Sequence, residues 1–143
     1  MKELGQTAVA ITDHGVMYGA IDFYRACKAQ GIHPVIGCEV YVARRTRLDK
    51  TYELDAESRH LVLLCQNETG YRNLSYLVSQ AFVDGFYIKP RIDLDLLRRH
   101  SEGLIGLSAC GCTAARRGSR RAWPVKFPAA WSAATMRGPR NTP

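Results

Sequence analysis

The chain has 143 residues, of which 46% are hydrophobic, and a formal net charge of +7. This length is enough for one domain with a modest core, and no run approaches the roughly 18 apolar residues of a membrane span. The start of the chain lacks the apolar core of a signal peptide, so we expect a cytoplasmic protein with no membrane partner. The odd number of cysteines does not imply disulfides.

The positive charge is confined to the C-terminal end of the chain. Residues 1–110 contain 13 basic and 13 acidic side chains, whereas residues 111–143 contain basic side chains and no acidic ones. This tail is rich in Ala, Arg, Gly and Pro and has neither helical nor strand periodicity. We expect either a disordered basic tail that contacts phosphates or a GC-rich gene segment read in the wrong frame.

The first elements predict a βαβ unit. Residues 7–12 are apolar and β-branched without clean alternation, which is typical of a strand covered on both faces. Residues 18–30 place Ile21, Tyr24 and Cys27 at helical spacing, and they are followed by a second apolar run at 33–42. Such a unit is nearly always right-handed.

Strands and helices continue to alternate after a charged segment at residues 43–58, which we expect to be an exposed loop. The pattern predicts strands at 60–65 and 103–110, helices at 69–83 and 93–100, and an aromatic and basic link at 84–91. This order predicts an α/β fold with a mainly parallel sheet or an incomplete barrel. Sites in such folds lie at the carboxyl ends of strands.

The end of the first strand carries the first candidate ligands. Asp13 and His14 offer oxygen and nitrogen to a divalent ion, and Gly15 allows the backbone to turn directly after them. In the structural alternative, Asp13 caps the following helix and His14 only covers the strand end.

Three further residues are candidates by their places in the predicted strands. Glu39 lies late in the second strand and Cys110 closes the last one, whereas His60 begins its strand and fits the expected edge less well. His33 and His100 are expected to be structural, and the basic cluster at 44–47 is expected to be a solvated loop.

Several long motifs, in order, carry a family resemblance. They include Ile-Thr-Asp-His-Gly at 11–15, Gly-Ile-His-Pro-Val-Ile-Gly-Cys-Glu-Val-Tyr at 31–41, Gly-Phe-Tyr-Ile-Lys-Pro-Arg-Ile-Asp at 85–93 and Leu-Ser-Ala-Cys at 107–110. Residues 2–110 closely resemble the N-terminal PHP (polymerase and histidinol phosphatase) domain of bacterial DNA polymerase III alpha subunits. The resemblance implies a distorted seven-stranded β/α barrel.

The resemblance also implies a site. His14, Glu39, His60 and Cys110 match positions of a metal cluster, and Asp13 lies beside them as a residue that could orient His14. Two imidazoles, a carboxylate and a thiolate suit zinc, or else manganese or iron. Such a cluster implies phosphoester hydrolysis. In polymerases of this type that activity is associated with 3′–5′ proofreading. The resemblance therefore also implies DNA and other replicase subunits as partners.

The chain also departs from the family pattern. It begins inside the helix that follows the family's first strand, so the His-x-His pair of that strand is absent, and the resemblance ends at Cys110. We therefore expect an incomplete PHP domain over 1–110 and a tail over 111–143, with weak metal binding by the chain alone. The alternatives are a free-standing PHP phosphoesterase, such as a histidinol phosphatase, and a non-catalytic scaffold or nucleic-acid-binding module.

Overall fold

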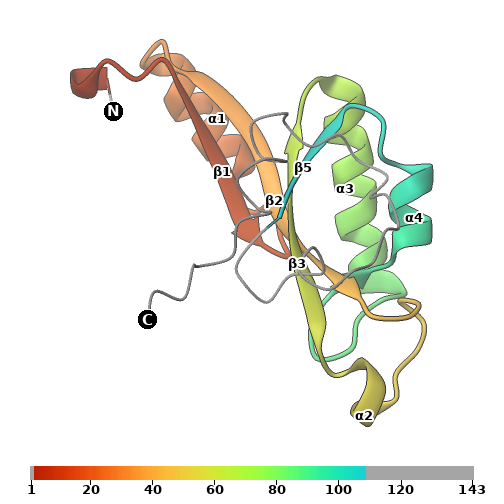
Figure 1. The fold of residues 1–143 in the computed structure, drawn as a ribbon. Coiled ribbons are helices and arrows are strands. Elements are labelled where there is room, and N and C mark those ends of the chain that lie inside the picture. Colours follow the sequence, from red (N-terminus) through yellow and green to blue (C-terminus); the bar gives the residue numbers. More distant parts are fainter. Residues whose placement is uncertain (1, 109–143) are drawn as a thin grey trace, which may run out of the picture.

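A five-stranded sheet with helices packed on it makes up the part of the chain that the computed structural model describes, residues 2–108 (Figure 1). The strands are β1 (Ala8–His14), β2 (His33–Ala43), β3 (Ser58–Cys65), β4 (Arg91–Ile92) and β5 (Leu104–Ser108). The helices are the 3-10 turn η1 (Lys2–Leu4) and the α-helices α1 (Ala20–Ala29), α2 (Tyr52–Asp55), α3 (Glu68–Val83) and α4 (Leu94–Arg99). The predicted alternation of strands and helices is confirmed, whereas α2 and β4 are additions to it.

The sheet is mixed and open, with strand order β1-β2-β3-β5. β1 and β4 both pair with β2 in parallel, one beside its first part and the other beside its last residues, while β3 runs antiparallel to β2 and β5. The prediction of a mainly parallel sheet is therefore wrong around β3. The link between β2 and β3, residues 44–57, brings the chain back beside the end of β2, where Ala43 pairs with Ser58, so the two strands run in opposite directions.

The turn after β1 depends on a glycine. Gly15 has a φ of +71°, in the left-handed region, and its N–H donates to the Glu39 carbonyl at 2.8 Å. The turn leads into α1, which buries Cys27 as its pattern predicts. Ile21 and Tyr24, expected on the same buried face, are 53% and 47% exposed. α1 thus covers its end of the sheet with only part of its apolar stripe.

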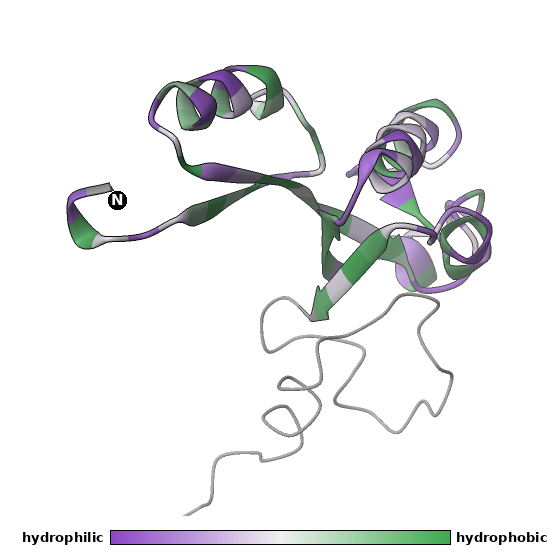
Figure 2. Ribbon diagram, turned by 90° about the horizontal axis from the view of Figure 1, so that it is seen from above, coloured by the Kyte–Doolittle hydropathy of each residue, from purple (hydrophilic) through white to green (hydrophobic). Residues whose placement is uncertain are grey.

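The core lies on one face of the sheet. Alternate residues of β2 and β3, among them Val40 and Leu63, pack against Leu74 and Leu77 of α3. Viewed along the sheet, α1, α3 and α4 lie on this same side (Figure 2). Because successive strand residues point to opposite faces, the residues between these core positions, such as Glu39, lie on the face away from the helices.

The charged segment between β2 and β3 is an ordered loop that Arg91 of β4 ties to the sheet. The guanidinium of Arg91 is fully buried and donates to the carbonyl oxygens of Arg47, Asp49, Asp55 and Gly85 at 2.8–3.2 Å.

Each helix in residues 2–108 is too short or too polar to cross a membrane. Cys110 and the tail over 111–143 lie outside the described residues.

Candidate functional site

Three of the predicted ligands meet on the face of the sheet away from the helices. His14 ends β1 directly beside Glu39 of β2, and His60 of β3 lies beside Tyr41, two residues further along β2. One carboxylate oxygen joins the three: Glu39 Oε1 is 2.7 Å from His60 Nδ1 and 3.5 Å from His14 Nε2. The sequence prediction thus selected side chains that are in contact.

The direction of β3 explains the position of His60. Its place at the start of a strand fits poorly with a site at carboxyl ends if every strand is parallel. Since β3 is antiparallel to β2, its beginning lies beside the later part of β2, where Tyr41 is the register partner of His60. The strand start therefore brings His60 to the same edge as the end of β1.

The contact between Glu39 and His60 fixes the roles of the imidazole nitrogens. A carboxylate can only accept hydrogen bonds, so His60 Nδ1 is the donor in the 2.7 Å contact. A ring that carries its single proton on Nδ1 presents the lone pair of its other nitrogen, Nε2, to a metal ion or a proton. Glu39 and His60 are largely buried, with 15% and 24% of their side chains exposed, whereas the His14 side chain is 71% exposed. The cluster is open to solvent on the His14 side.

Asp13 lies apart from the cluster. It precedes His14 in the strand and so points to the opposite face, where its Oδ2 accepts a hydrogen bond from the N–H of Gly19 at 3.4 Å. Gly19 is the N-cap of α1, so this contact agrees with the structural alternative, in which Asp13 stabilises the helix start. The expected contact of Asp13 with His14 stays a prediction.

Cys38 also lies on the helix-covered face. Its thiol donates to the Asp13 carbonyl at 3.3 Å, and burial raises its pKa to about 12. Cys38 is fully buried and remains a protonated thiol at neutral pH, as expected of a small buried hydrophobe. It is free, like Cys27 and Cys65.

Tyr41 is a neighbour of the cluster that the sequence prediction missed. Its ring packs edge-on against the His60 ring, with centroids 5.0 Å apart and planes at 85°. Burial raises the pKa of Tyr41, and the charge of Glu39 raises it further. The signal was available in the sequence, because a residue two positions after Glu39 in a strand shares its face.

The metal set itself is incomplete in the described part of the chain. Within residues 2–108, no group of three or more His, Cys, Asp or Glu side chains is arranged to hold a metal ion. Cys110 lies outside these residues. What the structure brings together is two imidazoles around one carboxylate, and these are donor types that bind zinc, manganese and iron.

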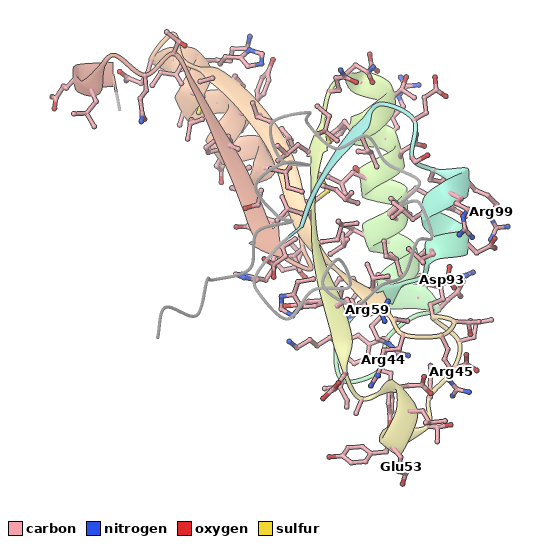
Figure 3. All side chains as sticks on the ribbon, viewed as in Figure 1. Arg44, Arg45, Glu53, Arg59, Asp93 and Arg99 are labelled. Atoms are coloured by element: carbon pink, nitrogen blue, oxygen red, sulfur yellow. The ribbon has the colours of Figure 1, made fainter. Side chains whose placement is uncertain are left out.

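The arginines after β2 are paired with acidic side chains. Arg44 contacts Glu57, Arg45 contacts Asp55, and Arg47 contacts Asp93, which is the N-cap of α4. Figure 3 shows Arg44 and Arg45 near the α2 end of the sheet. These ion pairs neutralise the charge of the three arginines, two of them within the loop, which favours the solvated-loop interpretation over a nucleic-acid surface there.

Two further histidines lie away from the cluster. His33 begins β2, at the end of the sheet opposite His60, and its N–H donates to the Thr7 carbonyl at 2.8 Å. His100 is the C-cap of α4 and packs against Tyr76, with ring centroids 4.4 Å apart. Both positions agree with the structural roles expected for them.

Comparison with known proteins identifies the family. The sequence model of the PHP domain matches residues 1–134. The chain is 57% identical over 110 residues to the DNA polymerase III subunit alpha of Chlamydia pneumoniae, covering 76% of this chain and 9% of that protein. The same subunit of Treponema pallidum is 52% identical over 110 residues (76% of this chain, 9% of the relative), and that of Thermus aquaticus is 50% identical over 105 residues (72% and 9%).

These matches agree with the family resemblance that the sequence motifs carry. The chain spans about 9% of the length of the relatives named above. Its similarity to DNA polymerase III alpha subunits extends over about three quarters of its own length. The chain therefore belongs to the PHP domain family.

Proposed function

We propose that the cluster of His14, Glu39 and His60 is a metal-dependent phosphoester-hydrolysing site, in a domain that serves a replicative DNA polymerase. The observation that carries the proposal is the shared contact of both imidazoles with Glu39 Oε1. The relatives are polymerase subunits, so DNA is the proposed substrate and other replicase subunits are the proposed partners. In this proposal the open sheet is part of a distorted β/α barrel.

The donor set suits a divalent cation. His14, Glu39 and His60 would hold zinc, or else manganese or iron, and Cys110 is proposed as a further ligand. A bound ion supplies a water molecule of lowered pKa and neutralises charge on phosphate oxygens. Glu39 holds the His60 ring through Nδ1, so His60 Nε2 can bind the ion or accept a proton. Asp13 is retained only as a proposed orienting residue, acting through the backbone of His14.

Metal titration tests the ligand assignment. We expect the chain to bind Zn²⁺ and Mn²⁺ with a dissociation constant weaker than about 10 μM, because His14, Glu39 and His60 must rearrange to surround an ion. Glu39→Gln should abolish the changes in chemical shift that Zn²⁺ causes in the ring signals of His14 and His60. His33→Ala, at the other end of β2, should leave these changes as they are in the wild type. Metal binding that survives Glu39→Gln would refute the assignment.

Hydrolysis tests the chemistry. We expect slow, Mn²⁺-dependent release of nucleotide from the 3′ end of labelled single-stranded DNA, lost in both His14→Ala and His60→Ala. The control is His100→Ala, which lies at the end of α4. Equal rates in wild type and the two cluster variants would exclude this site. Tight binding with steady turnover would instead contradict the expectation of an incomplete cluster.

A further inference from the structure

A lysine from a distant segment lies beside the ring that contacts the cluster. The ammonium nitrogen of Lys89 is 4.5 Å from the centroid of the Tyr41 ring, and the same ring packs edge-on against His60. Tyr41 is buried, with 8% of its surface exposed, whereas Lys89 is exposed. The segment before β4 therefore places an exposed cationic side chain next to the edge of the site.

The backbone that carries Lys89 is held in an unusual turn. Ile88 has a φ of +62°, a conformation that a β-branched residue rarely adopts, and the Tyr87 N–H donates to the Lys89 carbonyl at 3.0 Å. On the other side, Pro90 packs close to Gly15, where an added Cβ would lie 3.1 Å from Pro90 Cγ. A strained backbone persists only where its surroundings fix it, and here it fixes the position of Lys89.

In residues 2–108, Lys89 makes none of the ion pairs, whereas Arg44, Arg45 and Arg47 all contact carboxylates. Its visible partner is the face of Tyr41, a weak and readily exchanged contact for an ammonium group. A phosphate oxygen at the cluster would offer a stronger, charge-assisted hydrogen bond within reach of the flexible lysine stem.

We propose that Lys89 is the phosphate-binding residue of this site. Its ammonium group moves away from the face of the Tyr41 ring and binds a phosphate group placed at the cluster of His14, Glu39 and His60. The proposal rests on the proposed function, because it takes the substrate to be a phosphoester. The ligand class is a nucleotide phosphate, either a terminal monoester or an internal diester. Lys89 would determine where the phosphate lies relative to His60.

The test measures phosphate binding without metal, so that it does not depend on the metal ligands. Inorganic phosphate is titrated in the presence of a chelator, and the Tyr41 and His60 ring signals are followed by NMR. We expect Lys89→Ala to weaken phosphate binding about tenfold, because one charge-assisted hydrogen bond is lost. Lys89→Arg should restore most of the affinity, because the guanidinium can form that hydrogen bond again. Thymidine 3′-monophosphate and dithymidylate then distinguish the monoester from the diester.

Lys28 provides a matched control on α1. Its ammonium also lies over a tyrosine ring, 5.6 Å from the centroid of Tyr24, but on α1 rather than beside the cluster. Lys28→Ala removes the same charge, so it should leave phosphate affinity unchanged. Equal losses in Lys28→Ala and Lys89→Ala, or no loss in Lys89→Ala, would overturn the proposal. So would the absence of phosphate binding in the wild-type chain.

The two proposals fail in different ways. If the cluster variants lose metal binding and hydrolysis while Lys89→Ala keeps wild-type phosphate affinity, the role of Lys89 is refuted and the proposed function stands. If Lys89→Ala weakens phosphate binding but the cluster neither binds metal nor hydrolyses DNA, the phosphate site is supported and the hydrolytic function is refuted.

Discussion

At the level of single residues, one acidic side chain of the loop between β2 and β3, Asp55, is buried and held by hydrogen bonds. Asp55 is fully buried and accepts hydrogen bonds from the Arg45 guanidinium and from the Thr51 N–H at 2.9 Å. The hydrogen bond from Arg45 is the main cause that lowers the pKa of Asp55 to about 2. Its negative charge is therefore part of the folded structure.

This pKa predicts a specific acid sensitivity. A carboxyl group whose pKa falls from 3.8 in the unfolded chain to about 2 in the folded one stabilises the fold above pH 3.8. That contribution is lost as the pH falls through about 2. In urea unfolding, we expect Asp55→Asn to be less stable than wild type at pH 7, with the difference shrinking as the pH approaches 2.

A neighbouring carboxyl group is the control for this prediction. Glu57 pairs with Arg44 at the surface, with 85% of its side chain exposed, so Glu57→Gln should leave the unfolding free energy almost unchanged at every pH. A constant difference between wild type and Asp55→Asn from pH 7 to pH 2 would contradict the role of the Asp55 charge.

At the level of elements, the short strand β4 anchors the loop between β2 and β3 to the sheet. Its two residues pair with the end of β2, and the side chain of Arg91 supplies donors to four carbonyl oxygens, three of them in the loop between β2 and β3. The carbonyls of that loop have no strand to pair with, so the buried guanidinium replaces backbone donors. The loop is ordered for this reason.

Removing this donor should unfold the loop and weaken the domain. We expect Arg91→Met to lower the unfolding free energy by at least about 3 kcal/mol, because buried carbonyls lose their partners. Hydrogen exchange should accelerate over residues 44–57. Arg99→Met is the matched control: Arg99 forms an exposed pair with Asp95, worth less than about 0.5 kcal/mol. Similar losses in both variants would argue against the anchoring role.

At the scale of the whole molecule, the sheet ends in two unpaired edges within residues 2–108. β1 and β5 are the outer strands of the path β1-β2-β3-β5, and the face opposite the helices carries half-buried apolar residues such as Val62 and Leu107. Unpaired strand edges with apolar neighbours promote pairing between molecules. The chain is expected to self-associate as its concentration rises.

A charge on the β1 edge should reduce this association. Ala10 is an exposed residue of β1, so Ala10→Lys should raise the concentration at which light scattering increases. Ala29→Lys adds the same charge at the exposed end of α1 and serves as the control. If both variants gain solubility equally, net charge rather than the strand edge governs association.

Part of the candidate site could be predicted from the sequence, and part could not. His14 ends one apolar run and Glu39 lies late in the next, so a local pattern is enough to place them in the later parts of two strands. The partnership of His60 with Glu39 depends on the direction of β3, which no local pattern encodes. Tyr41 and Lys89 come from positions that share a face or a turn with the site only after folding.

Motifs identify the family, and periodicity along the chain predicts the order of the main elements and most of the apolar positions that build the core. The antiparallel direction of β3, the pairing of β4 with β2 and the open edges of the sheet are visible only in the folded chain. The tertiary structure also places Asp13 against the start of α1 rather than in the cluster. The physical reason is that strand direction and side-chain contacts depend on residues that lie far apart in the sequence and come together only when the chain folds.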